Sequence, residues 1–270
     1  MIELYASTKI GIEKIDVKFW TFPAGERGVK IESPINGDSV IIKMKFENSD
    51  SIIDLLLLFD AVRRVTDAPI DLEILYFPYA QQDRVCNQGE SFSLQVIANL
   101  INTMPYRRIY VNDPHSYVLS ALFPAGKLVI RTQAELMKEN FFNFYNVAGC
   151  VLIAPDNGAS KKIQELSKLT GIPYVEFTKV RAANGEVEST KCTIDFEKYI
   201  QDNSIQYAYV IDDICVKGGT FISLAKEVRK YYNAELNLYV THGVFAAGKE
   251  ELLKYFDNVK AVESLNSKSN

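Results

Sequence analysis

A pair of acidic residues stands a few positions before a glycine-rich turn in this sequence. An apolar, β-prone run ends in Asp212 and Asp213, and the turn that follows ends in Gly218, Gly219 and Thr220. The residues after this turn have the apolar spacing of a helix, and a helix N-terminus binds anions such as phosphate. Paired carboxylates bind sugar hydroxyls or a divalent cation. The stretch therefore predicts a site for a phosphorylated sugar, and the alternative is a turn whose aspartates only cap the helix.

Length and composition restrict the class of protein. At 270 residues the chain is near the size at which one hydrophobic core divides into two. Its 47% hydrophobic and 24% charged residues are typical of a soluble globular protein. The net charge of −4 argues against a nucleic-acid-binding surface, because such surfaces are normally basic. We expect one large or two modest α/β domains and no nucleic-acid partner.

The sequence contains no run of apolar residues long enough to cross a bilayer, and its start lacks the pattern of a signal peptide. We therefore expect a cytoplasmic protein that does not bind membranes. Its cysteines, Cys86, Cys150, Cys192 and Cys215, lie far apart and form no Cys-x-x-Cys pair. Free thiols are expected, rather than a zinc site or disulfide bonds.

Strand-like runs alternate with helical patterns along the chain, which predicts an α/β fold with mainly parallel sheets in two doubly wound domains. Strands are expected at residues 2–6, 15–20, 40–46, 72–77, 108–111, 129–130, 150–154, 174–177, 188–193, 207–211 and 236–241. Helices are expected at residues 52–65, 92–102, 135–141 and 250–255, and after residues 158 and 218. No linker rich in Ser, Gly or Pro separates the halves, and we place the domains at residues 1–145 and 146–270.

Polar side chains follow several of these strands directly. They are Gln82, Asp83 and Arg84 after the strand at 72–77, His115 after 108–111, and Asp156 after 150–154. Ligands bind at the carboxyl ends of strands in open α/β sheets, so these residues are candidates for a binding site. A lone histidine such as His115 is, as an alternative, often a structural hydrogen-bonding residue.

Two basic regions receive different interpretations. Lys179 and Arg181 lie in a polar stretch after the strand at 174–177, which we interpret as a mobile loop. A merely solvated loop is the alternative. Lys161 and Lys162 belong to the helix after residue 158, and we expect both on its solvent face.

Taken together, the motifs resemble those of the ribose-phosphate diphosphokinases, also called phosphoribosyl-diphosphate synthetases. The matching segments are Phe77-Pro78-Tyr79-Ala80 with Gln82-Asp83-Arg84, Asp113-x-His115, Pro155-Asp156-x-Gly158, Lys179-x-Arg181, Asp212-Asp213 with Gly218-Gly219-Thr220, and Thr241-His242-Gly243. They occur in the family's order over nearly the whole chain. The resemblance implies two phosphoribosyltransferase-type, Rossmann-like domains, the first binding ATP and the second a sugar phosphate, with the last strand able to pack on the first domain.

The resemblance also implies an activity. Members of this family transfer the β,γ-diphosphoryl group of Mg-ATP to the anomeric hydroxyl of a ribose and release AMP. Such a reaction requires positioning and charge neutralisation rather than covalent catalysis. By resemblance, Lys179 and Arg181 stabilise the charge of the transition state, and His115 and Asp156 position the Mg²⁺ ion carried by ATP.

The remaining roles follow from the same resemblance. Gln82, Asp83 and Arg84 would form the nucleotide pocket, which Phe22 and Glu26 of a neighbouring subunit would complete, so a homo-oligomer built from dimers is implied. Asp212, Asp213, Lys217, Gly218, Gly219 and Thr220 would hold the ribose and its phosphate. His242 is expected to be structural.

Three departures from the family pattern concern the substrates. Val216 and Lys217 replace an Asp-Thr pair in the phosphate loop, which adds a positive charge and removes a negative one at the 5′ end of the sugar. Gln81 stands in place of an arginine, and Ala24 in place of an aspartate. We therefore keep two acceptors: ribose 5-phosphate, and ADP-ribose, whose product would serve the salvage of NAD.

Two further alternatives are of other classes. A catalytically silent relative that regulates a true synthetase would be expected to lose the loop cations Lys179 and Arg181 or the metal residues His115 and Asp156, and all are present. A phosphoribosyltransferase that consumes the diphosphate would share the acidic pair and the glycine turn. It would not need the ATP motif of the first half.

Overall fold

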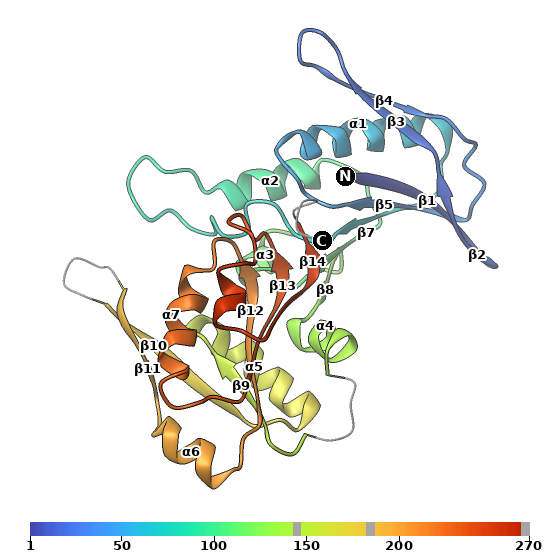
Figure 1. Ribbon diagram of the computed structural model, residues 1–270. Helices are drawn as coiled ribbons and strands as arrows, with labels where there is room; N and C mark the ends of the chain where they lie inside the picture. The colour runs from blue at the N-terminus through green and yellow to red at the C-terminus, as the bar shows by residue number, and fades with distance from the viewer. Residues whose placement is uncertain (143–146, 182–186, 266–270) are drawn as a thin grey trace. The chain divides into compact units, whose positions relative to one another are not determined.

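The computed structural model describes residues 1–142, 147–181 and 187–265, and of residues 179–181 and 187–190 only the backbone. The chain forms two compact units, Met1–Arg131 and Thr132–Asn270 (Figure 1). The division falls before the boundary that we expected near residue 146. The reason is that α4 (Gln133–Asn140) packs its buried side chains against the second core, where Met137 joins Ile163 and Leu166.

The first unit is built on a six-stranded sheet in the order β2-β1-β5-β6-β7-β8. Its strands are β1 (Ile2–Thr8), β2 (Gly11–Ile15), β5 (Ser39–Met44), β6 (Ile70–Ile74), β7 (Arg108–Asn112) and β8 (Leu128–Arg131). Strands β5 to β8 run parallel, and β1 is antiparallel to both of its neighbours. Because β6 and β7 are parallel neighbours, the segments that follow them leave the sheet at the same edge.

The single strand expected at residues 15–20 is in fact two. β2 ends at Ile15, and β3 (Val17–Thr21) pairs with β4 (Arg27–Ile31) in a separate hairpin. This hairpin lies along α1 (Asp50–Val65), as Figure 1 shows, and its apolar side chains Val17, Phe19, Val29 and Ile31 pack against the core. The hairpin explains why α1 is apolar around most of its circumference: it is covered by the sheet and by the hairpin.

Two shorter helices complete the first unit. They are α2 (Ser93–Asn102), which agrees with the helix expected at residues 92–102, and α3 (Val118–Ala121). Leu94, Ala98 and Ile101 of α2 are buried in the same core as the strands. These helices follow the polar segments after β6 and β7, and they anchor the far ends of both segments.

The second unit contains another six-stranded sheet, in the order β11-β10-β9-β12-β13-β14. Its strands are β9 (Cys150–Ala154), β10 (Tyr174–Arg181), β11 (Val187–Cys192), β12 (Tyr207–Cys215), β13 (Glu235–Gly243) and β14 (Asn258–Ser264). All neighbours are parallel except the edge pair of β10 and β11. The prediction of an α/β fold with mainly parallel sheets is thus confirmed. The strand expected at residues 236–241 is β13, and β14, which was not expected, pairs with it inside this sheet.

Helices cover both faces of the second sheet. On one face, α4 and α5 (Asn157–Thr170) share a core with Leu152, Tyr209 and Ile211 of the strands. On the other face, α6 (Phe196–Asp202) and α7 (Gly219–Val228) pack with Ala208 and Val210. The helix expected at residues 250–255 is only a 3₁₀ turn, Leu252–Lys254. Because Ala208 and Val210 belong to one core and Tyr209 and Ile211 to the other, alternate residues of β12 face different helices.

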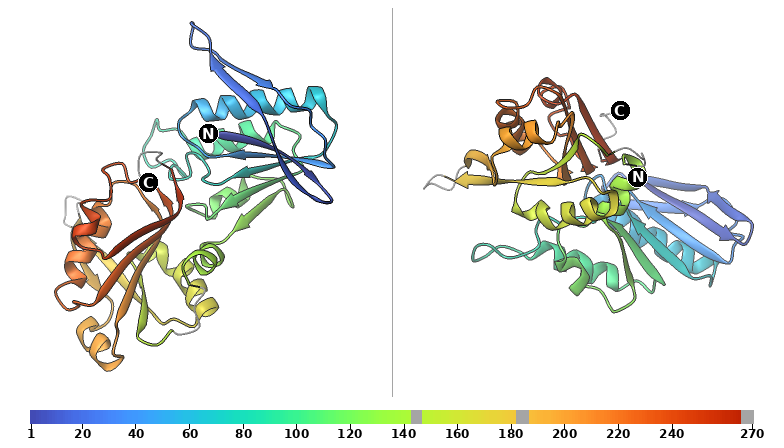
Figure 2. Two further views of the ribbon diagram at one scale, coloured as in Figure 1. Left: turned by 45° about the vertical axis from the view of Figure 1, so that its right-hand side comes forward. Right: turned by 90° about the horizontal axis from the view of Figure 1, so that it is seen from below.

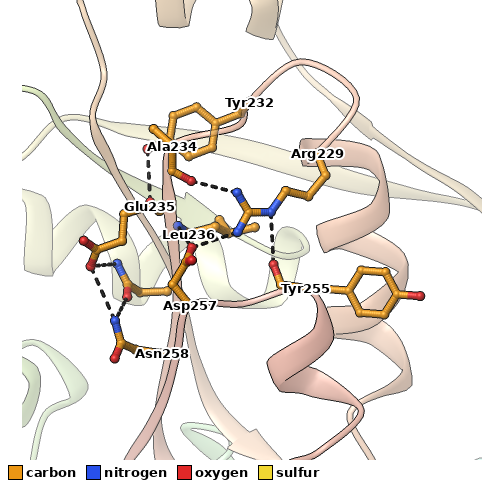
Figure 3. Close-up of polar contacts among 9 residues, drawn as sticks. Arg229, Tyr232, Ala234, Glu235, Leu236, Tyr255, Asp257 and Asn258 are labelled. Carbon is orange, nitrogen blue, oxygen red and sulfur yellow. Dashed lines mark hydrogen bonds and ion pairs between the residues drawn. The ribbon is translucent and has the colours of Figure 1, made fainter.

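A polar network ties the first residues of β13 and β14 to the end of α7 (Figure 3). The guanidinium group of Arg229 donates hydrogen bonds to the carbonyl oxygens of Ala234 and Tyr255 and to the carboxylate of Asp257, at 2.7, 3.0 and 2.8 Å. Asp257 also accepts a bond from the N–H of Leu236. The network stabilises the amino-terminal edge of the sheet, which leaves the carboxyl edge as the place for ligand binding.

No helix in the described part of the chain is both long enough and apolar enough to span a bilayer.

Candidate functional site

Acidic side chains meet at the carboxyl edge of the second sheet. Val210 of β12 is paired with Ile153 of β9, so the residues that come next, Asp212 and Asp156, are brought to the same edge. Asp156 is the N-cap of α5, and its Oδ1 atom accepts hydrogen bonds from the N–H groups of Gly158 and Ala159 at 3.0 and 3.3 Å. The carboxylate of Asp156 is thereby held in a defined position.

Burial and the acidic neighbours both affect the carboxyl group of Asp212. Burial of its carboxyl group raises the pKa of Asp212 well above the ordinary value, and the negative charges of Asp213 and Asp156 raise this pKa further. Its Oδ1 atom accepts a hydrogen bond of 2.9 Å from the N–H of Asp213. A site of this kind favours a cation or the hydroxyl donors of a sugar, because either relieves the repulsion between carboxylates.

A lysine contacts the second aspartate of the pair. The Nζ atom of Lys162, on α5, lies 3.6 Å from Oδ2 of Asp213, and the two side chains are only 14% and 8% exposed. The expectation that Lys162 faces water is therefore wrong, whereas Lys161 is exposed. Lys162 follows the buried Ala159 by three positions and precedes the buried Leu166 by four, so it lies at the edge of the buried face of α5. This spacing in the sequence could have predicted that Lys162 is partly buried.

The glycine turn opens α7 as the sequence predicted, but without a side-chain cap. The N-cap is Gly218, at φ +85°, and no side chain of the described residues caps the helix. The alternative interpretation, in which Asp212 and Asp213 serve only as caps of α7, is therefore wrong. The first-turn N–H groups of α7 have no partner within the helix, and Lys217 is exposed next to them.

The segment after β13 supports this turn from behind. The carbonyl oxygen of Cys215 accepts hydrogen bonds from the N–H groups of Val244 and Phe245 at 2.9 and 3.1 Å, and that of Val216 accepts one from Ala246 at 2.8 Å. His242, which we expected to be structural, is 2% exposed inside β13. The Thr241-His242-Gly243 motif thus lies in the strand that leads to this support.

Gly243 is required by packing. A Cβ atom at Gly243 would lie 2.1 Å from the ring of Phe245 and 2.8 Å from Cβ of Ala261. Phe245 itself has a positive φ of +45°, which is uncommon for a bulky side chain. The absence of a side chain at residue 243 lets this ring close over β13.

The first unit brings together another group of the predicted residues. Arg84 donates two hydrogen bonds to the buried carboxylate of Asp83, at 2.9 and 3.2 Å. The bonds from Arg84 lower the pKa of Asp83 against the opposing effect of burial, and a hydrogen bond from Ser116 and the charge of His115 lower it further. The segments after β6 and β7 therefore place Asp83, Arg84 and His115 near one another.

Two residues of these segments have strained backbones. Tyr79 and Asp113 adopt positive φ angles of +61° and +36°. Such conformations cost about 1–3 kcal/mol and persist where the surrounding structure holds them, often at functional sites. The hydroxyl of Tyr79 forms a 2.9 Å hydrogen bond with that of Ser49, and the N–H of Asp113 donates to the carbonyl oxygen of Arg131. No sequence pattern signals these conformations.

Gln82 has a structural contact within the first unit. Its Oε1 atom accepts a 2.6 Å hydrogen bond from the hydroxyl of Ser93, at the start of α2. The carbonyl oxygen of Gln82 accepts a bond from the N–H of Leu94. Gln82 thus connects the segment after β6 to α2, whatever contact it makes with a ligand.

Phe22 and Glu26 lie apart from this group. They close the turn of the β3–β4 hairpin, where the N–H of Phe22 donates to the carbonyl oxygen of Glu26. Phe22 is 45% exposed, and its ring packs edge-on against Trp20. In Figure 1 and on the left of Figure 2, this turn extends beyond α1, away from the segment after β6. The unit does not by itself bring Phe22 and Glu26 to Asp83 and Arg84.

Lys179 and Arg181 belong to the end of β10. The strand continues to Arg181 and is paired with β11, with Lys179 opposite Thr190, so residues 178–181 belong to a strand and not to the loop that we expected there. The side chains of both residues lie outside the described residues, as do residues 182–186. Their catalytic role stays a prediction.

Comparison with known proteins identifies the family. A model of the N-terminal domain of ribose phosphate pyrophosphokinase matches residues 5–104. The ribose-phosphate pyrophosphokinase of Thermococcus kodakarensis is 30% identical over 89% of this chain and 82% of its own length. The chain belongs to the ribose-phosphate pyrophosphokinase family. Its counterpart from Pyrococcus furiosus is also 30% identical, over 95% of this chain and 86% of its own.

A solved structure shows the family fold as well. The phosphoribosylpyrophosphate synthetase of Mycobacterium smegmatis matches 90% of this chain and 78% of its own, with a TM-score of 0.71 and 20% identity. This ribose-phosphate pyrophosphokinase fold agrees with two phosphoribosyltransferase-type units. The resemblance inferred from the six motifs is therefore confirmed, and the chain is a diphosphotransferase of this family.

Proposed function

We propose that this protein transfers the β,γ-diphosphoryl group of ATP to the anomeric hydroxyl of a 5-phosphorylated ribose and releases AMP. The observation that carries the proposal is the meeting of Asp156, Asp212 and Asp213 at one sheet edge, which α7 adjoins with its uncapped first turn. One end of this site suits hydroxyl groups or a cation, and the other suits a phosphate. A phosphorylated ribose offers both.

The acceptor is held by groups of the second unit. The aspartate pair at the end of β12, Asp212 and Asp213, forms the part of the site that receives the ribose hydroxyls. The N–H groups of Gly218, Gly219 and Thr220 receive the 5′-phosphate, assisted by the charge of Lys217. A backbone cradle at a helix N-terminus binds phosphate without a dedicated side chain, so the small residues of the turn are what allow the phosphate to approach.

The nucleotide is held by groups of the first unit. Arg84 and Asp83 are fixed against each other, with His115 nearby, and the exposed guanidinium of Arg84 can contact a phosphate. Gln82 completes this group. Phe22 and Glu26, on the projecting hairpin, would contact the nucleotide of a second copy of the chain, so we propose a homo-oligomer built from dimers.

The described residues form no group of three or more side chains that could hold a metal ion by themselves, so a magnesium ion would have to arrive with ATP. Mg²⁺ binds oxygen atoms and takes one or two protein carboxylates besides substrate phosphates. The crowded carboxylates around Asp212, whose pKa is raised by burial and by its acidic neighbours, provide such oxygens. Asp156 of the second unit would contribute such an oxygen, and the metal role of His115, in the first unit, rests on the family resemblance alone. When bound, the ion neutralises phosphate charge.

The chemistry needs no covalent intermediate with the protein. The anomeric hydroxyl releases its proton to solvent as its oxygen forms a bond to the β-phosphorus atom. The bond from that atom to the oxygen bridging the α- and β-phosphates breaks, with AMP as the leaving group. The side chains of Lys179 and Arg181 would stabilise the charge on the transferred phosphates. Such contacts act mainly in the transition state, so their loss lowers kcat.

Ribose 5-phosphate is the acceptor that the names of the relatives suggest. A specific observation favours ADP-ribose as a second candidate: Lys217 is exposed immediately before the phosphate turn. There it would face a second phosphate on the 5′ oxygen. The terminal ribose of ADP-ribose keeps the anomeric hydroxyl that the reaction needs.

The decisive experiment measures AMP release from ATP and Mg²⁺ with ribose 5-phosphate and with ADP-ribose in separate reactions. We expect release that depends on the acceptor and that falls by orders of magnitude in Asp212→Asn. A parallel assay with Lys179→Ala is expected to show a kcat reduced about 10²-fold or more. Absence of AMP release with both acceptors would reject the proposal and favour a regulatory, catalytically silent subunit.

A further inference from the structure

The two adjacent aspartates of β12 face different sides of the sheet. Side chains of a strand alternate between its faces. Ala208 and Val210 belong to the core shared with α7, whereas Tyr209 and Ile211 belong to the core shared with α5. Continuing this alternation places Asp213 on the α5 side, where Lys162 contacts it, and Asp212 on the other side, that of α7 and its uncapped first turn.

The contact between Lys162 and Asp213 is shielded from water. The side chain of Lys162 is 14% exposed, that of Asp213 is 8% exposed, and the atoms Nζ and Oδ2 are 3.6 Å apart. Replacing either partner of a shielded pair removes a compensating charge from a buried position. Here the carboxylate of Asp213 also stands next to Asp212, close to Asp156, so the lysine supplies a positive charge inside a group of carboxylates.

From this geometry we infer that Lys162 is a positioning residue that divides the roles of the aspartate pair. Lys162 holds the carboxylate of Asp213 on the α5 side, so Asp213 serves as an anchor for the end of β12. Asp212 is then the aspartate that contacts the ribose hydroxyls. This inference rests on the proposed function, and Lys162 itself does not touch the acceptor.

The test replaces Lys162 by methionine, which keeps much of the length and removes the charge. Lys162→Met is expected to weaken acceptor binding, measured by calorimetry, and to raise the acceptor KM about tenfold, the scale of one hydrogen bond to a charged group. The KM for ATP should change less than about twofold, because the nucleotide groups belong to the first unit. Lys162→Arg, which keeps the charge, should restore most of the acceptor affinity.

The neighbouring lysine supplies the matched control. Lys161→Met removes the same charge from the same helix at an exposed position, and it should leave the acceptor KM unchanged. Asp213→Asn should itself weaken acceptor binding, and adding Lys162→Met to it should cause little further loss, because the charge that the lysine compensates is gone. This double variant also stays measurable if Lys162→Met alone does not fold, because it removes both charges of the pair together.

The outcomes separate this inference from the proposed function. The role of Lys162 would be overturned if Lys162→Met folded and bound the acceptor as tightly as the wild type does. It would also be overturned if Lys161→Met lost as much acceptor affinity as Lys162→Met. In both cases the activity of the wild type would still stand. Fully additive losses in the double variant would overturn the role of Lys162 too. If the wild-type chain bound neither ribose 5-phosphate nor ADP-ribose, both the proposed function and this role would be rejected.

Discussion

The side chain of Leu252 packs against the backbone of Gly218 at the start of α7. A Cβ atom at residue 218 would lie 3.0 Å from Cδ2 of Leu252, and the φ angle of Gly218 is +85°. The turn proposed to bind phosphate is thus held between a 3₁₀ turn on one side and the hydrogen bonds from Val244 to Ala246 on another. Its shape is set by the last part of the second unit.

We therefore expect Gly218→Ala to lower the stability of the protein by about 1–2 kcal/mol, because the new methyl group meets Leu252 and the residue must keep a left-handed conformation. Thermal unfolding measures this effect. The acceptor KM should rise as well, since the amide groups of the turn shift. Gly219→Ala is the stability control, because a Cβ atom at residue 219 meets no atom within 4 Å. If both variants lowered the unfolding midpoint equally, contact with Leu252 would not be the cause.

The ion pair of Arg229 and Asp257 should make stability depend on pH. Burial disfavours the charged form of Asp257, but hydrogen bonds from the N–H of Leu236 and from Arg229 outweigh it and hold the pKa of Asp257 below its ordinary value of 3.8. A group with a lowered pKa in the folded state stabilises that state above its unfolded pKa. This stabilisation is lost as the pH falls through the lowered folded pKa.

Asp257→Asn should accordingly be less stable than the wild type at pH 7, and the difference should shrink as the pH falls below about 4. Chemical unfolding at a series of pH values measures it. The control is Asp202→Asn, at an exposed position of α6. Its difference in stability from the wild type should not shrink as the pH falls. A difference between Asp257→Asn and wild type that stayed constant down to pH 2 would show that the charge of Asp257 is not the cause.

Lys217→Thr should shift the preference between acceptors toward ribose 5-phosphate. An exposed charge–charge contact contributes up to about 1 kcal/mol, so the ratio of kcat/KM for ADP-ribose to that for ribose 5-phosphate should fall several-fold. Lys198→Thr, which removes an exposed lysine from α6, is the control and should leave this ratio unchanged. Identical ratios in Lys217→Thr and wild type would eliminate the argument for a second phosphate.

The four cysteines should differ in reactivity. Cys86 is exposed, whereas burial raises the pKa of Cys150 and Cys192, and raises that of Cys215 to about 12. Because the thiolate is the reactive form, Cys215 at pH 8 should carry only ~10⁻⁴ of its population as thiolate. A thiol-specific disulfide reagent should therefore label Cys86 quickly and Cys215 only after unfolding. Rapid labelling that persisted in Cys86→Ser would contradict this assignment.

Local patterns were sufficient for much of the fold. The apolar run before Asp212, the glycine turn after Asp213, and the helix behind it all appear in the structure where the sequence placed them. The strand at residues 15–20 was predicted wrongly because Ile15 and Val17 look alike in sequence but belong to different pairings. Which strand partners a residue finds is a property of distant segments rather than of local periodicity.

The sequence by itself determined the alternation of strands and helices, the order of the motifs, and with them the family to which the chain belongs, because these depend on residue types and spacing along the chain. Only the tertiary structure decided that Lys162 pairs with Asp213, that no side chain among the described residues caps the glycine turn, and that the β3–β4 hairpin covers α1. The physical reason is that each of these contacts joins segments far apart in sequence. Their energies depend on burial and on distances that appear only when the sheets are assembled.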